Sequence, residues 1–232
     1  MTDEVIILAG GLGTRLKEAV KDVPKPMAPI GNLPFLAYLF LYLKKFPINR
    51  VVLAVGHKHE SISDYFRNKY QGMEIDYAIE KEPLGTGGAI VNALKLTKNN
   101  TAFLLNGDTF FKVDLLQLFQ HHQKSKAQLT LALKPMQQFN RYGTVETSDS
   151  RIIKFNEKKP VNKGLINGGV YVIEKQSFEL LNLPVKFSFE KEILEKETLQ
   201  WNMQALICEG YFIDIGIPDD FKKAQQELPN QI

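Results

Sequence analysis

The sequence predicts an α/β fold in which helices cover both faces of a mostly parallel sheet. Over residues 1–135, short runs rich in β-branched residues alternate with longer amphipathic runs. This alternation is typical of βαβ units, whose strands are buried on both faces. A glycine-rich turn at residues 10–13 follows the first apolar run, at the sheet edge where α/β proteins bind ligands. A hydrophobic content of 44% supplies a sizeable core and argues against disorder.

Each predicted element has its own signal in the sequence. The runs at 5–8, 50–55 and 102–105 are continuous and apolar, as buried strands are. The helix predicted over 34–45 has a proline in its first turn and two lysines in its last, which suits the two helix ends. The remaining elements of this part follow from apolar spacing: strands over 74–79 and 128–133, and helices over 60–68, 86–96 and 115–122.

The pattern changes after about residue 140, although no Ser/Gly/Pro-rich linker divides the chain. We therefore expect one domain over residues 1–232, in which 136–232 extends the core of 1–135 over the ligand edge of the sheet. Trp201, beside polar neighbours, is expected to be partly exposed. The elements predicted in the extension are strands over 143–147, 152–155, 165–172 and 202–207, a helix over 189–195 and a last helix after Pro218.

Composition excludes several classes of function. The 29 basic and 26 acidic residues give a net charge of +3, too balanced for the basic surface of a nucleic-acid binder. The single cysteine allows neither an intrachain disulfide nor a Cys-based zinc site. The first residues lack the features of a signal peptide, and no apolar run reaches the roughly 18 residues of a membrane span. We expect a cytoplasmic protein that binds neither nucleic acid nor membrane; the sequence is compatible with a homo-oligomer.

A candidate phosphate-binding loop follows the first predicted strand. Gly10, Gly11 and Gly13 let the backbone turn sharply and present N–H groups to an anion. Arg15 follows at once, and Lys25 stands between two prolines that stiffen its backbone. A glycine turn alone is more often an ordinary turn with solvated basic residues nearby. The prediction of a phosphate-binding loop therefore depends on the glycines, the arginine and the lysine together. The pattern is neither a dinucleotide fingerprint nor a P-loop, because it lacks the third glycine and the Gly-Lys-Ser/Thr of those motifs.

With this loop and this lysine, the sequence resembles the sugar-1-phosphate nucleotidylyltransferases, and later family motifs recur in order over essentially the whole chain. The resemblance implies a Rossmann-like three-layer sandwich, the nucleotide-diphospho-sugar transferase fold. It also implies a reaction in which a sugar 1-phosphate attacks the α-phosphorus of a nucleoside triphosphate and releases pyrophosphate. Residues 1–135 then form the nucleotide-binding core and 136–232 the sugar-phosphate-binding extension. The stretches 25–30, 80–89 and 105–111 most resemble members that act on GTP and a heptose 1-phosphate.

The reaction needs charge neutralisation more than a base, because the attacking oxygen is already anionic. We expect Arg15 to bind the β- and γ-phosphates and Lys25 to stabilise charge around the α-phosphate, as the two catalytic residues. The resemblance assigns further nucleotide contacts to the loop residues Leu8, Ala9, Gly10, Gly11, Gly13 and Thr14.

Two aspartates are candidate Mg²⁺ ligands. Mg²⁺ prefers one or two carboxylates together with phosphate oxygens and water. Asp108 ends a buried strand beside Gly107, and Asp214 is the one charge in an apolar run, where it needs a cation partner. The resemblance assigns both as ligands of Mg²⁺. The alternatives are a turn aspartate for Asp108, and a buried ion pair or helix cap for Asp214.

The segment 80–89 is expected to contact the base and the ribose through Glu80, Pro83, Gly85 and Thr86. Its glycine turn is predicted to leave backbone groups and a hydroxyl free at a helix N-terminus. Thymidylyl members of the family commonly carry glutamine at the position of Glu80. A carboxylate only accepts hydrogen bonds, so it suits the two adjacent N–H donors of guanine and favours GTP. Glu82 competes for this role, and either glutamate could be a solvated loop charge.

The resemblance places the sugar 1-phosphate in the second half of the chain. Gly143 belongs to a sugar-contacting turn that begins at Arg141. Glu157 is expected to bind sugar hydroxyls and Lys158 the sugar phosphate, although Lys159 is an alternative and a solvated turn is another. The remaining predicted sugar-phosphate contacts are Asn106, Asn167 and Gly169.

The sequence alone leaves other functions open. Within the class, the alternatives are mannose-1-phosphate guanylyl transfer and thymidylyl, uridylyl or cytidylyl transfer to a hexose 1-phosphate. Outside it, a non-catalytic nucleotide-sugar sensor would keep the fold. Such a sensor would lack the residues that neutralise phosphate charge and bind the metal. In this sequence those residues are all present: Arg15, Lys25, Asp108 and Asp214.

Overall fold

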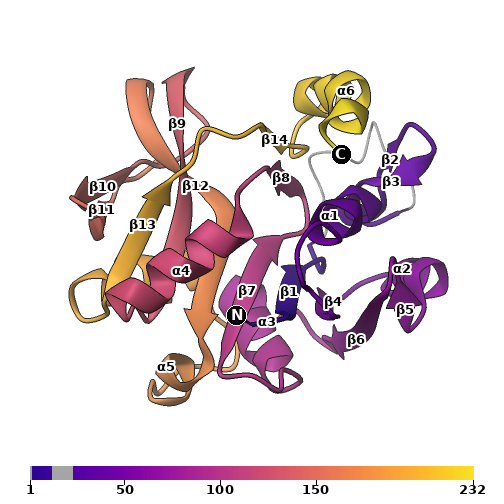
Figure 1. The fold of residues 1–232 in the computed structure, drawn as a ribbon, viewed down its shortest axis with the longest axis horizontal. Helices are drawn as coiled ribbons and strands as arrows, with labels where there is room; N and C mark the ends of the chain where they lie inside the picture. Colours follow the sequence, from indigo (N-terminus) through magenta and orange to yellow (C-terminus); the bar gives the residue numbers. More distant parts are fainter. Residues whose placement is uncertain (1, 12–22) are drawn as a thin grey trace.

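The computed structural model describes residues 2–11 and 23–232, and a large mixed sheet dominates it (Figure 1). The sheet order is β10-β11-β13-β9-β12-β7-β1-β4-β6-β5. All of these strands except β5, β11 and β12 run in one direction. The strands are β1 (Glu4–Leu8), β4 (Arg50–Val55), β5 (Lys69–Tyr70), β6 (Met73–Ile79), β7 (Thr101–Asn106), β9 (Leu129–Phe139), β10 (Val145–Ser148), β11 (Arg151–Phe155), β12 (Val161–Glu174) and β13 (Met203–Ile207).

Helices cover both faces of this sheet, so the predicted α/β sandwich with a mostly parallel mixed sheet is confirmed. The side chains of β1 alternate: Val5 and Ile7 belong to one buried cluster and Ile6 to the other. The α-helices are α1 (Phe35–Leu43), α2 (Glu60–Phe66), α3 (Gly85–Leu94), α4 (Leu115–Ser125), α5 (Lys175–Glu179) and α6 (Pro218–Glu227). Shorter helical turns are η2 (Lys25–Met27), the π-helix η3 (Glu190–Glu195), η4 (Glu197–Leu199) and η5 (Leu228–Gln231).

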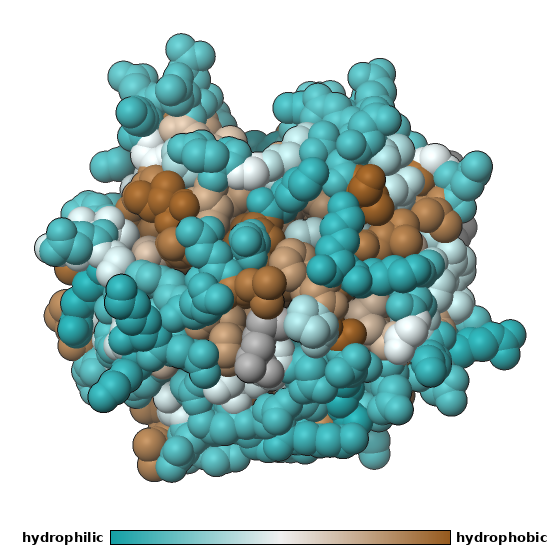
Figure 2. Space-filling model, in the orientation of Figure 1, coloured by the Kyte–Doolittle hydropathy of each residue, from teal (hydrophilic) through white to brown (hydrophobic). Residues whose placement is uncertain are grey.

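The second half of the chain continues the same sheet. In Figure 1, the ends of β9 and β12 rise on one side of the molecule and α6 on the other. Figure 2 shows the surface hollowed between these two parts. No helix in residues 2–11 and 23–232 is both long and apolar enough to cross a membrane.

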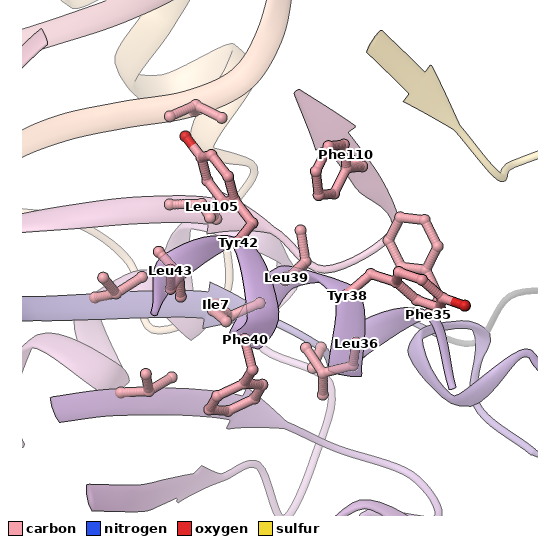
Figure 3. Close-up of a cluster of buried hydrophobic side chains, with 14 of the residues drawn as sticks. Ile7, Phe35, Leu36, Tyr38, Leu39, Phe40, Tyr42, Leu43, Leu105 and Phe110 are labelled. Carbon is pink, nitrogen blue, oxygen red and sulfur yellow. The ribbon is translucent and has the colours of Figure 1, made fainter. Parts of the chain in front are cut away.

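The buried cluster around α1 anchors the strands that lead to this hollow. Figure 3 shows Leu39 and Leu43 of α1 near Ile7 of β1 and Leu105 of β7. Almost the whole of α1 is buried, which is expected of a helix that is apolar all round. Its tyrosine hydroxyls still find partners, since Tyr42 donates to the carbonyl of Val113 at 2.5 Å.

Two short ladders complete the fold, and neither follows from the periodicity of the sequence. The strands β2 (Pro29–Ile30) and β3 (Leu33–Pro34) form a small hairpin before α1. The strands β8 (Thr109–Phe111) and β14 (Phe212–Asp214) pair antiparallel, with Asp214 opposite Thr109. The amide of Ile215 also donates to the carbonyl of Asp108 at 3.0 Å, so this second ladder brings Asp108 and Asp214 together.

Two details differ from the sequence-based prediction. Trp201 is only 4% exposed, because its ring packs edge-on against Phe178 at 5.3 Å between ring centres. The predicted strand over 165–172 is the middle of the longer β12, whose register shifts between Asn167 and Tyr171. A side chain at Gly168, inside this irregularity, would overlap the ring of Phe111.

Candidate active site

A cavity of about 390 Å³ lies at the carboxyl ends of β1, β4, β6 and β7. Its size is within the range of small-molecule sites, and its position is where α/β sheets bind ligands. The predicted site residues that line it come from four separate parts of the chain: Leu8, Gly10, Gly11, Lys25, Glu80, Pro83, Gly85, Thr86, Asn106 and Asp108.

Lys25 and Asp108 form an ion pair in the cavity. The Lys25 Nζ lies 2.7 Å from Oδ2 of Asp108, and the lysine side chain is only 16% exposed. Pro24 precedes η2 with an extended backbone, and Pro26 stands within it. The two prolines therefore hold the lysine where the sequence predicts, at one place in the cavity wall.

Asp214, at the end of β14, lies beside Asp108 but does not itself line the cavity in the described part of the chain. The pKa of its carboxyl is raised, first by burial and then by the nearby charge of Asp108. Lys25, the amide of Gly216 and Arg141 act in the opposite direction. The Gly216 N–H donates to Oδ1 of Asp214 at 2.7 Å. Asp214 thus has a cation partner, as a buried carboxylate requires. Nη2 of Arg141 lies 3.5 Å from Oδ2 of Asp214, a longer distance than the 2.7 Å between Lys25 and Asp108.

This donor set fits Mg²⁺. Both side chains offer the hard carboxylate oxygens that Mg²⁺ prefers, and neither is fully enclosed: Asp108 is 36% exposed and Asp214 is 22% exposed. Within the described residues no group of three or more His, Cys, Asp or Glu side chains gathers as a complete metal site. Two carboxylates that leave the other positions to phosphate oxygens and water match Mg²⁺ rather than structural zinc.

The described part of the glycine loop shows why its residues are small. The amide of Ala9 donates to the carbonyl of Ala54 at 2.8 Å, and Ala9 is 1% exposed, so it holds the loop to β4 rather than lining the cavity. A Cβ at Gly10 would lie 3.2 Å from the amide nitrogen of Gly56, tighter than most real contacts. The roles of Gly13, Thr14 and Arg15 stay predictions, because these residues lie outside the described ranges.

Glu80 is better placed than Glu82 to contact a bound base. Glu80 lines both the 390 Å³ cavity and a neighbouring one of about 660 Å³, whereas Glu82 lines the second but not the first. Oε2 of Glu80 accepts the amide of Leu84 at 3.0 Å. Burial raises the pKa of Glu80, and this hydrogen bond opposes the shift. A half-buried carboxylate with one oxygen already fixed is suited to recognising N–H donors.

The turn that begins α3 is not free, contrary to the sequence-based prediction. The hydroxyl of Thr86 donates to Glu190 at 2.7 Å and accepts the amide of Phe189 at 2.9 Å. The amide of Gly87 donates to the carbonyl of Phe187 at 3.0 Å. Glu190 also lines the cavity, although no motif in the sequence marks it.

This packing predicts a cost for a side chain at position 87. A Cβ on Gly87 would overlap the ring of Phe187, so Gly87→Ala should lower the free energy of unfolding by about 1–3 kcal/mol. Urea denaturation of the wild type, Gly87→Ala, Phe187→Ala and the double variant measures this cost. Without the ring, the Gly87→Ala change should cost little; equal costs in both backgrounds would mean that the overlap is not the cause.

Three of the predicted sugar contacts lie together. Asn106 ends β7, and a Cβ at Gly169 would lie 2.7 Å from its Nδ2. Gly169 has a φ of +73°, which glycine adopts without strain. The Asn167 Nδ2 donates to the hydroxyl of Tyr171 at 2.7 Å, and its Oδ1 accepts the amide of Gly169 at 3.0 Å. This arrangement fixes the orientation of the Asn167 amide.

The other predicted sugar contacts lie near the connection between β11 and β12. Gly143 packs against the carbonyl of Asn156, where a Cβ would not fit. Within the described part of the chain, Glu157 and Lys158 are exposed and do not line the cavity. Arg141, which begins the sugar-contacting turn of the motif, instead faces Asp214 and Asp220.

Comparison with known proteins shows the family of this chain. Residues 4–231 match the nucleotidyl transferase family, and the chain belongs to that family. It is 56% identical to a D-glycero-alpha-D-manno-heptose 1-phosphate guanylyltransferase of Aneurinibacillus thermoaerophilus, over 99% of this chain and 100% of the relative. It is 50% identical to a protein of the same description from Campylobacter jejuni, over 94% of this chain and 96% of the relative.

The solved structures agree as well. HddC from Yersinia pseudotuberculosis, complexed with GMP-PN, superimposes with a TM-score of 0.86 at 36% identity, covering 97% of this chain and 98% of HddC. The family and the enzyme class predicted from the glycine loop and the proline-flanked lysine are therefore confirmed.

Proposed function

We propose that this protein transfers the guanylyl group of GTP to D-glycero-α-D-manno-heptose 1-phosphate, giving GDP-heptose and pyrophosphate. The observation that carries the proposal is one cavity in which Lys25, Asp108 and Glu80 meet. These residues provide a cation, a candidate metal ligand and a candidate base contact for one bound nucleotide. The similarity over almost the whole chain to two heptose 1-phosphate guanylyltransferases supports the choice of sugar and base.

The proposed reaction is an in-line displacement at phosphorus. An oxygen of the sugar phosphate forms a bond to the α-phosphorus of GTP, and the bond from that phosphorus to the bridging oxygen of the β-phosphate breaks. Lys25 stabilises the charge that develops around the α-phosphate, and Arg15 binds the departing pyrophosphate. Asp108 and Asp214 would hold a Mg²⁺ ion, which supplies positive charge to the triphosphate when bound.

The sugar phosphate is proposed to lie beside Asn106, Asn167 and Gly169. The fixed amide of Asn167 can then discriminate among hydroxyl positions. Glu157 and Lys158 complete this site by contacting the sugar hydroxyls and the sugar phosphate. Because GTP is supplied inside the cell, the proposed reaction takes place in the cytoplasm.

Glu80 is proposed to select guanine, so Glu80→Gln should relax base choice. The carboxylate accepts both N–H donors of the guanine edge, whereas glutamine offers only one accepting oxygen. We expect the ratio of kcat/KM for GTP to that for UTP or dTTP to fall by about tenfold or more. Glu82→Gln removes the same charge from the neighbouring cavity and should leave the ratio unchanged. An unaltered ratio in Glu80→Gln would assign base selection to another residue.

The raised pKa of Glu80 predicts how GTP binding depends on pH. Protonation removes an acceptor, so affinity should fall as pH is lowered through the pKa of Glu80. Since burial raises this pKa, the decrease begins at a higher pH than for an ordinary glutamate. The pH profile of GTP affinity is also measured for Glu80→Gln. The phosphates of GTP titrate in the same way with both proteins, so the difference between the two profiles is the contribution of Glu80. Identical pH profiles for the two proteins would contradict the assignment.

A matrix of substrates tests the proposed function. The purified protein is incubated with Mg²⁺, one of five nucleoside triphosphates, and heptose, mannose or glucose 1-phosphate, and pyrophosphate is measured. We expect the highest kcat/KM for GTP with the heptose 1-phosphate. A preference for mannose 1-phosphate, or for another nucleotide, would replace the proposed substrate. Nucleotide binding without pyrophosphate release in any combination would indicate a non-catalytic protein.

A further inference from the structure

Arg141 links the first turn of α6 to Asp214. Its Nη1 donates to Oδ2 of Asp220 at 2.5 Å, and its Nη2 lies 3.5 Å from Oδ2 of Asp214. Tyr142 strengthens this link: its hydroxyl accepts a hydrogen bond from Nη2 of Arg141 at 2.9 Å and donates to Oδ2 of Asp214 at 3.3 Å. Segments around residues 141, 214 and 220 are thereby joined by one chain of polar contacts.

Each candidate metal ligand contacts a different cation, although the charge of Lys25 also acts on Asp214. Lys25 contacts Asp108 and also lines the cavity. Arg141 contacts Asp214 but does not line the 390 Å³ cavity in the described part of the chain. Arg141 can thus offset the repulsion between Asp214 and Asp108 without entering the nucleotide cavity.

Asp220 binds Nη1 of the Arg141 guanidinium, while Nη2 faces Asp214. A guanidinium is rigid and planar, so a carboxylate bound to one terminal nitrogen restricts where the other terminal nitrogen points. Asp220 does not cap α6, since the N-cap residue is Ile217 and no side chain caps that end. The carboxylate of Asp220 is instead bound to Arg141, and the charge of Arg141 is thereby directed at Asp214.

We propose that Asp220 and Arg141 are positioning residues that hold Asp214 in place for a divalent cation. The affinity for the cation would then depend on a residue of α6 that touches neither the cation nor the substrates. The inference rests on the proposed function, because it takes Asp108 and Asp214 as the metal ligands.

The test measures binding of Mn²⁺–GTP to the full chain by water proton relaxation, and binding of GTP alone in EDTA. Asp220→Asn keeps the size of the side chain but weakens its hold on Arg141. We expect it to weaken Mn²⁺–GTP binding by about tenfold, as loss of a residue behind a metal ligand does, and to leave GTP binding in EDTA unchanged. A merely structural role for Asp220 would move both affinities together or neither.

The matched control is Asp219→Asn. Asp219 lies in the same turn of α6, is exposed, and forms no ion pair among the described residues. The change removes the same charge and should leave both affinities at wild-type values. Arg141→Lys is a second variant, because an ammonium has one nitrogen and cannot reproduce the contacts of two fixed nitrogens; it should show the same loss as Asp220→Asn. Thermal denaturation of each variant shows whether it is folded.

Asp214→Asn separates this inference from the proposed function. If Asp214→Asn weakens Mn²⁺–GTP binding but Asp220→Asn and Arg141→Lys bind it like the wild type, the positioning role is wrong and the metal site stands. If Asp214→Asn also binds like the wild type, the metal assignment itself fails. A loss in Asp219→Asn equal to that in Asp220→Asn would show a general effect of charge and overturn the positioning role.

Discussion

Lys25→Ala is expected to lower kcat by about 10²–10³ while the protein stays folded. The Lys25 ammonium is mostly buried and fixed beside Asp108 at 2.7 Å, so it is oriented before the substrates arrive. Such a preorganised charge stabilises the transition state more than a mobile, solvated one. Steady-state kinetics with saturating GTP and sugar 1-phosphate measures the loss, and circular dichroism confirms the fold.

Lys222→Ala is the matched control, because Lys222 lies exposed on α6 and does not line the cavity. It should retain wild-type kcat. If Lys25→Ala turned over within a few-fold of this control, Lys25 would not be the residue that stabilises charge at the α-phosphate. Of the two predicted catalytic residues, Arg15 alone would then remain to stabilise the transition state.

Asp108→Asn is expected to reduce kcat/KM on the order of a hundredfold or more, since it removes a full charge from a candidate metal ligand and leaves Lys25 without its ion pair. Its steric effect is small, because asparagine has nearly the same shape. Raising the Mg²⁺ concentration should restore part of the activity if the loss lies in metal binding. Activity is measured as pyrophosphate release across a Mg²⁺ titration.

The control for Asp108→Asn is Asp149→Asn, in the exposed turn between β10 and β11. Asparagine also tolerates the positive φ of 52° at this position. Asp149→Asn should behave as the wild type at every Mg²⁺ concentration. An Asp108→Asn variant with wild-type activity at low Mg²⁺ would exclude Asp108 as a ligand.

The sequence predicts many of the residues that line the cavity, for a physical reason. Parallel strands buried on both faces produce continuous apolar runs, and the polar residues that follow each run meet at one sheet edge. Glu80 and Asn106 come to one cavity in this way, beside Leu8 at the end of the first run. Lys25 could be singled out because the prolines on either side give it a distinctive local signal.

Other features depend on contacts between distant segments and have no local signal. Asp214 reaches Asp108 only because β8 and β14, each of three residues, pair across about a hundred positions of the chain. The hydroxyl of Thr86 is occupied because the segment ending at Glu190 packs on the start of α3. The bond of Arg141 to Asp220 likewise depends on where α6 is positioned by tertiary packing.

The fate of the individual phosphates of GTP tests the account most directly. The protein is incubated with the heptose 1-phosphate, Mg²⁺ and GTP labelled with ³²P at either the α- or the γ-phosphate, and the products are separated. Attack at the α-phosphorus predicts that the α-label enters the nucleotide sugar and the γ-label leaves in pyrophosphate. Transfer of the γ-label to the sugar, or release of both labels without a nucleotide sugar, would contradict guanylyl transfer.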